Sequence, residues 1–159
     1  MSKTPSTNAT RLLKAAGVVY SEHLYRYEDK GGTAHSAREL SVDEHAVIKT
    51  LVFEDDQKRP FLILMHGDRE VSVKELARQT GARSVQPCKP EVADKHSGYQ
   101  VGGTSPFGTR KAMPVYAEAT IFELDRIWIN GGAKGFLVAL EPAVLESLLK
   151  AVPVQVGLV

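Results

Sequence analysis

Residues 46–66 read AVIKTLVFEDDQKRPFLILMH, and this stretch decides the fold. Ala46 to Phe53 is rich in β-branched residues, which favour strands. Residues 55–58 have the polar composition of a hairpin turn. Pro60 to His66 supplies the partner strand. Because this second segment is almost entirely apolar, we expect it to be buried on both faces. The stretch therefore predicts a β-hairpin whose second strand lies in a core.

The segments before this hairpin alternate between helix and strand signals. Ser41-Val42-Asp43-Glu44 has the spacing of a capping box at the start of a helix. We further expect a helix over Thr7–Ala16 closed by Gly17, a strand over Val18–Tyr27, a loop over 28–33 and a short helix over Ala34–Leu40.

The segments after the hairpin also mix the two element types. Ser72-Val73-Lys74-Glu75 is a second capping box, and it opens a helix that ends at Gly81. We expect a helical turn over Pro90–Lys95, strands over Val115–Ala117, Thr120–Glu123, Arg126–Ile129 and Phe136–Leu140, and a last helix from Glu141-Pro142 with Val144, Leu145, Leu148 and Leu149 facing inward. Strict alternation of strand and helix is missing. The chain is therefore expected to be α+β, with a mixed or antiparallel sheet that curls toward a barrel and helices around it.

The composition narrows the class of protein. A length of 159 residues fits a single domain over 1–159. The net charge of +1 excludes a polycation, and no apolar run approaches the roughly 20 residues of a membrane span. With a polar start and no apolar signal core, we expect a cytoplasmic location. The single cysteine, Cys88, excludes an internal disulfide framework. Its place between Pro87 and Pro90 favours a structural role over a catalytic thiol.

Lys49 interrupts an otherwise apolar strand. By alternation along a strand, it shares a face with Val47, Leu51 and Phe53, so that face is expected to pack inward. An unpaired buried ammonium is costly, which indicates a ligand or an acidic partner nearby. The alternative is an edge strand from which the lysine extends to solvent.

Two glycine-rich loops stand out. Residues 97–108 read SGYQVGGTSPFG, and residues 130–135 read NGGAKG between two predicted strands. Clustered glycines allow backbone N–H groups to face a bound oxygen. Ordinary turns explain the same composition, and Asn-Gly is a strong hairpin signal. If both loops and Lys49 line one pocket, that pocket is the candidate site.

Charge and histidine spacing bear on the ligand. Between Arg78 and Lys111 there is a local excess of +4, which suits a phosphorylated or nucleic-acid-linked ligand or is an ordinary solvated face. The five histidines show no HExxH or Cys/His spacing, so we predict no metal and no cofactor. Neither a Gly-x-Ser-x-Gly elbow nor a P-loop ending is present, although a dispersed Ser-His-Asp triad stays open.

Taken together, the motifs resemble the YbaK family of aminoacyl-tRNA deacylases, which is related to the editing domain of bacterial prolyl-tRNA synthetase. The match rests on Val47-Ile48-Lys49-Thr50-Leu51, on residues 97–108 and on Gly131-Gly132-Ala133-Lys134-Gly135, in the same order. It runs over roughly residues 5–150. It implies an α+β fold with a curled mixed sheet and hydrolysis of the ester between a mischarged amino acid and the 3′ end of tRNA.

The resemblance also implies roles for particular residues. Lys49 corresponds to the family's essential lysine, and in the cysteine-specific branch the substrate's own thiol attacks the ester carbonyl. Gly102 and Gly103 are then expected to present N–H groups to the developing negative charge. Arg110 and Lys111 are expected to touch the tRNA acceptor stem. The predicted substrate-binding residues are Tyr25, Thr50, Ser105, Pro106, Gly108, Asn130, Gly131 and Gly132.

The sequence departs from the cysteine-specific branch at several points. Thr104 and Phe107 stand where close relatives carry isoleucine and leucine, and Asn130 stands where many carry a small residue. These differences bear on amino-acid specificity. The main hypothesis is a trans-acting deacylase for Cys-tRNA(Pro), with prolyl-tRNA synthetase as a possible partner. The alternatives are a non-catalytic module that binds the tRNA end or a synthetase, and a hydrolase of free aminoacyl esters.

Overall fold

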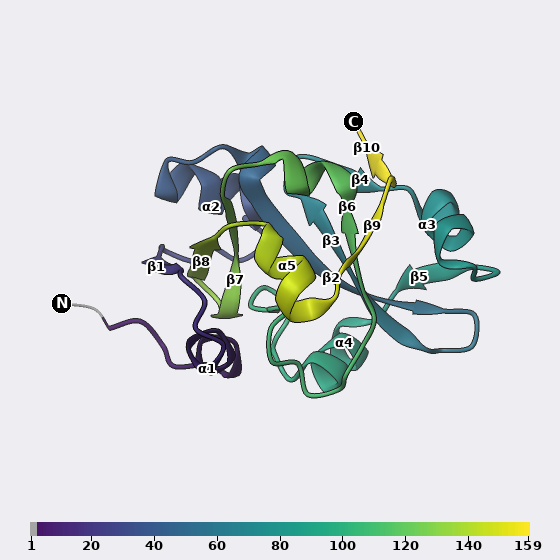
Figure 1. Ribbon diagram of the computed structural model, residues 1–159, viewed down its shortest axis with the longest axis horizontal. Helices are drawn as coiled ribbons and strands as arrows, with labels where there is room; N and C mark the ends of the chain where they lie inside the picture. The colour runs from purple at the N-terminus through teal and green to yellow at the C-terminus, as the bar shows by residue number, and fades with distance from the viewer. Residues whose placement is uncertain (1–2) are drawn as a thin grey trace.

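The computed structural model describes residues 3–159 and places the predicted hairpin in the middle of the sheet (Figure 1). Its strands are β2 (Val47–Asp55) and β3 (Pro60–His66), paired antiparallel with Lys49 opposite Met65. Between them, the Asp55 N–H donates to the Arg59 carbonyl at 3.1 Å. All six residues from Phe61 to His66 are buried, which confirms that β3 is covered on both faces.

The main sheet is mixed, as predicted. Its order is β1-β8-β7-β2-β3-β6-β9, with β5 as an additional partner of β2, and a separate small sheet joins β4 to β10. The pairs β2–β7, β3–β6 and β6–β9 are parallel, and the others in the main sheet are antiparallel. The remaining strands are β1 (Ser21–Leu24), β4 (Glu70–Val71), β5 (Val85–Pro87), β6 (Val115–Glu118), β7 (Ile127–Ala133), β8 (Phe136–Leu140), β9 (Val152–Val154) and β10 (Gly157–Leu158).

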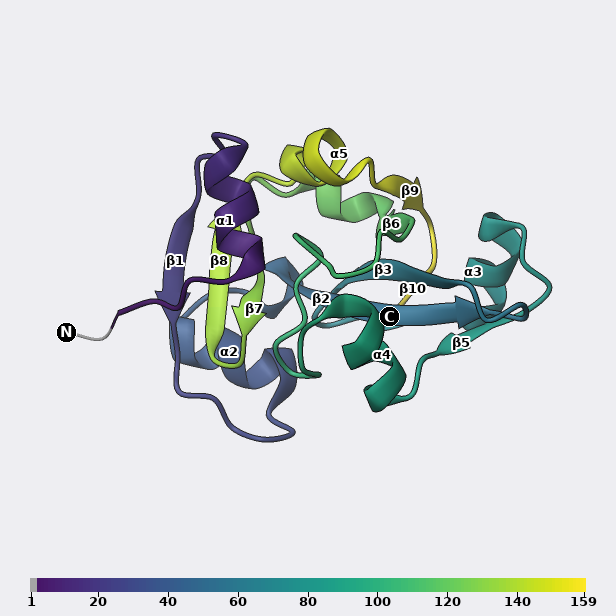
Figure 2. The same ribbon diagram turned by 90° about the horizontal axis from the view of Figure 1, so that it is seen from below.

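Helices cover both sides of the curled sheet. In Figure 2, α5 (Ala143–Leu149) lies on one side of β2 and α2 (Gly32–Leu40) on the other, while α4 (Pro90–Ser97) packs beside β2, with its Ala93 in the same buried cluster as Leu145 of α5. The helix α1 (Asn8–Ala15) packs near β7, and α3 (Val73–Thr80) near β5. Two short 3₁₀ helices, η1 (Glu44–Ala46) and η2 (Ala119–Glu123), complete the chain.

The alternating side chains of β2 divide the core. Ile48 and Val52 belong to the largest buried cluster, together with residues of α1 and α5 such as Leu13 and Leu145. On the opposite face, Val47 packs with α2 in one cluster. Phe53 packs with α3 in another. The sheet therefore has a continuous core on one face and two separate cores on the other.

Several sequence predictions are confirmed. The helices α1, α2, α3 and α5 lie within or close to their expected ranges, and the turn predicted at Pro90 is a full helix, α4. The Ser72 side chain accepts a hydrogen bond from the Glu75 N–H, as its capping position requires. The overall class, α+β with a curled mixed sheet and surrounding helices, is the observed one.

Three local predictions are wrong. Ser41 does not open a helix, because it closes α2 in the left-handed conformation (φ 56°), and Asp43 caps η1 instead. The expected strand over 120–123 is part of the 3₁₀ helix η2. The expected strand over 18–27 is confined to the four residues of β1.

Candidate active site

A cavity lies on β2 between the parts of the strand that α2 and α3 cover. On the face of β2 that carries Val47 and Phe53, α2 covers one end and α3 covers the other. Between them, Lys49 and Leu51 line a cavity of about 800 Å³. Residues of the loop before α2, of α4 and of the loop that follows α4 also line it. The cavity is large enough for a ligand the size of a nucleoside with a small attached group.

The sheet splits at the same place. On the edge of β2 away from β3, β7 pairs only with Val47 and Ile48, while β5 pairs only with 53–55. Backbone bonds along β2 alternate between its two edges. Val47 bonds toward the β3 side, since its carbonyl accepts from Gly67, and Val52 bonds toward the β5 side, since its carbonyl accepts from Cys88. The backbone N–H and C=O of Thr50 therefore face the split, where residues 3–159 supply no strand partner.

Thr50 also has an unsatisfied side chain. Among the buried side-chain oxygens and nitrogens of residues 3–159, only Thr50 Oγ1 lacks a hydrogen-bond partner. A buried hydroxyl without a partner destabilises a fold by about 1–3 kcal/mol. Thr50 lines the cavity where it meets the split edge of β2, so we treat this buried hydroxyl as a candidate contact for a ligand.

Lys49 shares the face of Val47, Leu51 and Phe53, as predicted, and its side chain is 20% exposed. Its Nζ donates to the Arg69 carbonyl at 2.5 Å and lies 3.9 Å from Glu70 Oε1. Glu70 is itself 87% exposed, so this ion pair is weak. The ammonium is thus held by one carbonyl, with the cavity beside it.

The loop after α4 reaches the cavity through a tight turn. The Gly103 N–H donates to the Gln100 carbonyl at 2.7 Å, and Gly102 has a φ of +95°. This is the arrangement of a type II turn, which requires glycine at its third position. The expectation that both glycines offer N–H groups to a ligand is therefore wrong for Gly103, whose N–H is committed to the turn. Gly102 lines the cavity.

The second glycine-rich loop is a bulge rather than a hairpin turn. Residues 130–132 lie inside β7, where the pairing with β8 shifts register between Asn130 and Ala133. The Asn130 side chain stabilises the bulge, since its Oδ1 accepts from the N–H groups of Gly132 (2.6 Å) and Ala133 (3.1 Å). Its Nδ2 lies 3.4 Å from the Gly102 carbonyl. Asn130 therefore joins the two loops at the cavity wall.

The loop before α2 lines the cavity next to the two glycine-rich segments. Tyr25, Tyr27 and His35 line the cavity, and Lys134 Nζ lies 5.4 Å from the centroid of the Tyr27 ring. Burial is the main reason why the pKa of Tyr25 is raised above its ordinary value. His35 is buried and bonds through Nε2 to the Arg26 carbonyl at 2.6 Å, which holds this loop against α2.

The geometry brings together five of the predicted site residues. Lys49, Tyr25, Thr50, Gly102 and Asn130 all line the one cavity, so the lysine and both glycine-rich segments converge as expected. The cavity is also lined by four residues that were not predicted as site residues: Tyr27, His35, Glu70 and Lys134. Of these, only Lys134 carried a signal, because it lies inside the second glycine-rich motif.

The other predicted substrate-binding residues do not line the cavity, and their binding roles stay predictions. Ser105 is fully buried and accepts from the Phe107 N–H at 3.2 Å. Gly108 lies against the backbone of Asn8, and Gly131 against the ring of Phe136. The other two, Pro106 and Gly132, are likewise buried or half-buried. These residues shape the two loops that carry Gly102 and Asn130.

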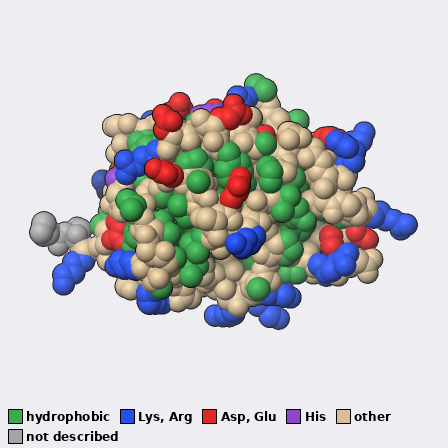
Figure 3. Space-filling model, viewed as in Figure 1, with side chains coloured by type: hydrophobic (Ala, Val, Ile, Leu, Met, Phe, Trp, Pro, Cys, Tyr) green, Lys and Arg blue, Asp and Glu red, His purple; other side chains and the backbone are tan. Residues whose placement is uncertain are grey.

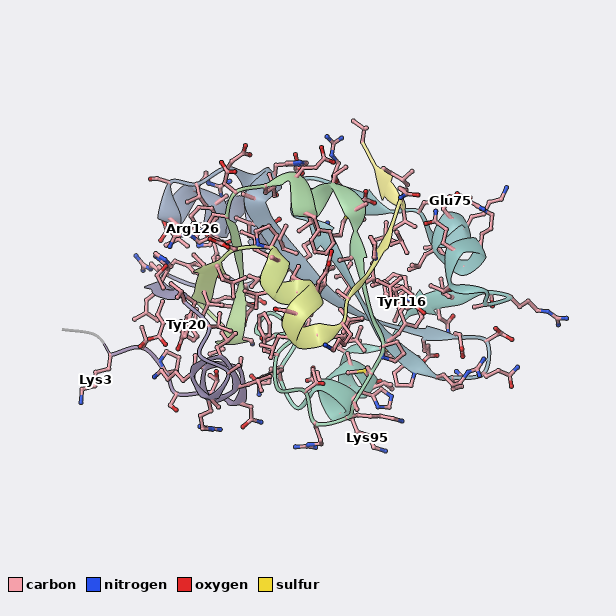
Figure 4. All side chains as sticks on the ribbon, in the orientation of Figure 1. Lys3, Tyr20, Glu75, Lys95, Tyr116 and Arg126 are labelled. Carbon is pink, nitrogen blue, oxygen red and sulfur yellow. The ribbon has the colours of Figure 1, made fainter. Side chains whose placement is uncertain are left out.

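Arg110 and Lys111 lie on an exposed basic surface. Their N–H groups donate to the carbonyls of Ser97 (2.9 Å) and His96 (3.0 Å), which ties the loop to the end of α4. Burial lowers the pKa of His96, and nearby Lys111 and Lys95 lower it further. In Figure 4, Lys95 extends outward from α4, and Figure 3 shows Lys and Arg side chains along this lower edge of the molecule. This basic edge lies outside the cavity lining.

Cys88 lines the cavity but is not an activated thiol. Its Sγ lies 3.5 Å from Glu54 Oε1. Burial, reinforced by the Glu54 carboxylate, raises the pKa of the Cys88 thiol to about 12. A nucleophilic cysteine requires the opposite shift. The structure therefore favours the structural role expected from the sequence.

One histidine cluster lies outside the cavity. Ligand atoms of His45, His66 and Asp68 lie within 4.8 Å of one another, a separation that allows a metal ion. However, His66 is already bonded at both nitrogens, to the His45 carbonyl and to Thr120 Oγ1, each at 2.7 Å. The rings of His45 and His66 stack at 3.7 Å. We interpret the cluster as a hydrogen-bonded support for the end of β3.

Comparisons with known proteins define the class. The fold superimposes with a TM-score of 0.83 on the crystal structure of "a putative trans-editing enzyme for prolyl tRNA synthetase", over 98% of this chain and all of that one, at 20% identity. Residues 28–148 match the family model described as the aminoacyl-tRNA editing domain. The chain belongs to this family, and its class of activity is aminoacyl-tRNA editing.

Two relatives show where such sequences occur. The chain is 28% identical over 143 residues to "Putative Cys-tRNA(Pro)/Cys-tRNA(Cys) deacylase EbsC" of Enterococcus faecalis, covering 89% of this chain and 87% of that protein. It is 34% identical over 105 residues to a proline–tRNA ligase of Nitratidesulfovibrio vulgaris, covering 64% of this chain but only 18% of the ligase.

Among residues 3–159, no helix has the length and apolar content needed to cross a bilayer.

Proposed function

We propose that this protein hydrolyses mischarged aminoacyl-tRNA in trans, in the cytoplasm, with Cys-tRNA(Pro) as its main substrate. The observation that carries the proposal is the position of Lys49. Its ammonium lies in a cavity beside the unpaired edge of β2, with Thr50 and Gly102 in the same lining. The name of the Enterococcus faecalis relative, which covers nearly the same length, supports the choice of substrate.

The cavity residues suit an acyl ester at the end of a nucleic acid. Ester cleavage builds negative charge on the carbonyl oxygen, and fixed donors stabilise it. In this proposal, Lys49 and the Gly102 N–H supply that stabilisation, while Thr50, Tyr25 and Asn130 orient the aminoacyl-adenosine. Ser105, Pro106, Gly108, Gly131 and Gly132 keep the two loops in shape. The basic edge with Arg110 and Lys111 contacts phosphates of the acceptor stem.

For a cysteinyl ester, the substrate's thiol is the proposed nucleophile. The sulfur–carbonyl bond forms as the carbon–oxygen bond to the ribose breaks, and the ribose oxygen takes the thiol proton. Water then opens the cyclic thioester to free cysteine. In this route no side chain of the protein acts as the nucleophile, which agrees with the raised pKa of the Cys88 thiol.

A deacylation panel tests the proposal. Cysteine, alanine and proline attached to tRNA(Pro) are incubated with the wild type, Lys49→Ala and Lys58→Ala. Lys58 is a matched control because it lies beyond β2 and is 78% exposed. We expect Cys-tRNA(Pro) to be hydrolysed fastest and Lys49→Ala to lose about 100-fold in rate or more. Lys58→Ala is expected to behave as the wild type.

Three results would contradict the proposal. If the wild type hydrolyses none of the panel but binds tRNA even as Lys49→Ala, the protein is a binding module. If it cleaves a minimal aminoacyl ester as fast as the charged tRNA, its substrate is a small molecule. If alanine or proline is released faster than cysteine, the assignment of substrate is wrong while the class of reaction stands.

A further inference from the structure

The end of the described chain crosses from the main sheet to the wall of the cavity. β9 pairs in parallel with β6, and the chain then leaves that sheet so that β10 pairs antiparallel with β4. Figure 1 shows this segment in yellow, rising along β6 toward β4. The Ser72 N–H donates to the Val156 carbonyl at 2.7 Å, which extends the pairing by one bond. Residues 155–158, which we call the brace, therefore hold β4.

Glu118, the last residue of β6, fixes the brace at the point where it changes direction. Its Oε1 accepts hydrogen bonds from the N–H groups of Val156 (2.7 Å) and Gly157 (2.8 Å). Glu118 is 6% exposed. Hydrogen bonds to an ionised carboxylate are about twice as strong as neutral ones, and a buried carboxylate without them is costly. Glu118 thus ties the brace tightly to the main sheet.

A second contact fastens the brace from α3. The Gln79 side chain donates to the Gln155 carbonyl and accepts from the Gln155 N–H, both at 2.9 Å. Val154 and Val156 on either side are buried against the core that contains Leu76. The brace is therefore held by side chains from two different elements.

The strand that the brace holds, β4, directly follows the residue that binds the Lys49 side chain. Lys49 Nζ donates to the carbonyl of Arg69, the residue directly before β4, and lies 3.9 Å from Glu70 within β4. Glu70 and Val71 also line the cavity. A strand of two residues has little stability of its own, so the position of β4 depends on what pairs with it.

We propose that Glu118 is a positioning residue for Lys49. By anchoring the brace, it keeps β4 and the Arg69 carbonyl in place, and this carbonyl aims the Lys49 ammonium into the cavity. The consequence for catalysis rests on the proposed function. The effect on the Lys49 side chain does not, so the two are tested separately.

The first experiment needs no RNA. Lysines of the native protein are acetylated with an N-hydroxysuccinimide ester, and the rate at Lys49 is measured by mass spectrometry relative to exposed Lys58. We expect Glu118→Ala to raise the relative rate at Lys49 about tenfold, as local opening of β4 becomes more frequent. Glu118→Gln keeps an acceptor oxygen for both N–H groups and is expected to stay near the wild type. Glu123→Ala, at an exposed glutamate of η2, is the matched control.

The second experiment measures single-turnover deacylation. We expect Glu118→Ala to lower the rate roughly 10- to 100-fold, as a displacement of about 1 Å does, with Glu118→Gln restoring most of it. In a Lys49→Ala background, the same substitution should have no further effect, because the lost positioning acts through Lys49. If Glu118→Ala does not fold, Gln79→Ala loosens the brace from its other side and is expected to give the same pattern more weakly.

Either experiment can overturn the inference. Unchanged acetylation of Lys49 in folded Glu118→Ala and in Gln79→Ala contradicts it. So does a loss of rate that is equally large in the Lys49→Ala background, since the role of Glu118 is then structural. A protein that shows the acetylation change but hydrolyses no aminoacyl-tRNA retains the brace and refutes only the proposed function.

Discussion

Lys49 and Thr50 are neighbours in sequence whose side chains lie on opposite faces of β2. The Lys49 ammonium is held by the Arg69 carbonyl at 2.5 Å. The Thr50 hydroxyl is buried without a partner. A residue that carries an unsatisfied polar group reduces the stability of the free protein, and such costs are common where a ligand will supply the missing contact. At Thr50, a polar group that lowers the stability of the free protein is therefore retained beside the residue that we propose for catalysis, Lys49.

At this scale we expect Thr50→Val to separate stability from activity. The substitution removes the unsatisfied hydroxyl with little change of shape, so the free energy of unfolding should rise by about 1 kcal/mol. Deacylation should fall about tenfold, the equivalent of one lost hydrogen bond to the ligand. Urea denaturation and the deacylation assay measure the two effects. Thr50→Ser retains the hydroxyl and serves as the control. Full activity in Thr50→Val would show that the hydroxyl does not contact the substrate.

Single residues were also where the sequence was most informative. Lys49 stands out because an ammonium in an apolar strand requires a partner. The partner itself, the Arg69 carbonyl, leaves no trace in the sequence, since any residue supplies a backbone carbonyl. For the same reason the commitment of the Gly103 N–H to Gln100 was not foreseen: the composition of a loop does not reveal its hydrogen bonds.

At the scale of elements, the contact between the two glycine-rich segments shapes one wall of the cavity. A Cβ added at Gly103 would lie 2.7 Å from the Lys134 nitrogen and 2.8 Å from the Ala133 carbonyl carbon. Both are backbone atoms at the end of β7 and the start of its connection to β8, so neither can rotate away. The loop and the hairpin approach this closely because position 103 carries no side chain.

We therefore expect Gly103→Ala to push the loop away from the hairpin. The free energy of unfolding should fall by about 1–3 kcal/mol, the usual cost of overpacking, and deacylation should fall with it as Gly102 moves. Gly17→Ala serves as a comparison for backbone strain without a clash, because Gly17 has a positive φ, which Gly103 lacks, and nothing lies within 4 Å of its added Cβ. Thermal unfolding and the deacylation assay provide the measurements. A Gly103→Ala protein as stable and active as the wild type would rule out the close approach.

The elements predicted well are those with strong local signals. Pro60–His66 is an apolar run of strand length, and Ser72 with Glu75 fixes the start of α3. The strands β4, β5, β9 and β10 were missed, because two or three residues carry no periodicity and their partners lie far away in the chain. The second glycine-rich segment was predicted as a turn from Asn-Gly. Its bulge depends on register with β8, which the sequence does not display.

At the scale of the whole molecule, buried histidines link stability to pH. His66 is 1% exposed, and burial is the main reason why the pKa of His66 is lowered. The pKa values of His23 and His96 are lowered too, again mainly by burial. When the folded state binds a proton less readily than the unfolded chain, acid favours unfolding.

We expect the free energy of unfolding to decrease as the pH falls below about 6.5, the pKa of histidine in an unfolded chain. The stabilisation is fully present above that value and is lost as the pH falls toward the lowered pKa values of the folded state. Urea denaturation at pH 7.5, 6.5 and 5.5, in wild type and His66→Gln, measures the effect, with a smaller slope expected for the variant. Equal stability at pH 7.5 and 5.5 in the wild type would contradict the prediction. Carboxylates such as Asp68, whose pKa is also lowered, titrate below this window.

The pairing of β2 with β3 has a consequence for how the chain assembles. Lys49 lies opposite fully buried Met65, and the odd and even residues of β2 serve different faces. A misalignment by one position would turn the ammonium toward the apolar interior formed by Leu62 and Leu64. That error is expensive enough to be rejected early. Lys49, the residue that we propose for catalysis, is thus also expected to disfavour a shifted register of β2 on β3 during folding.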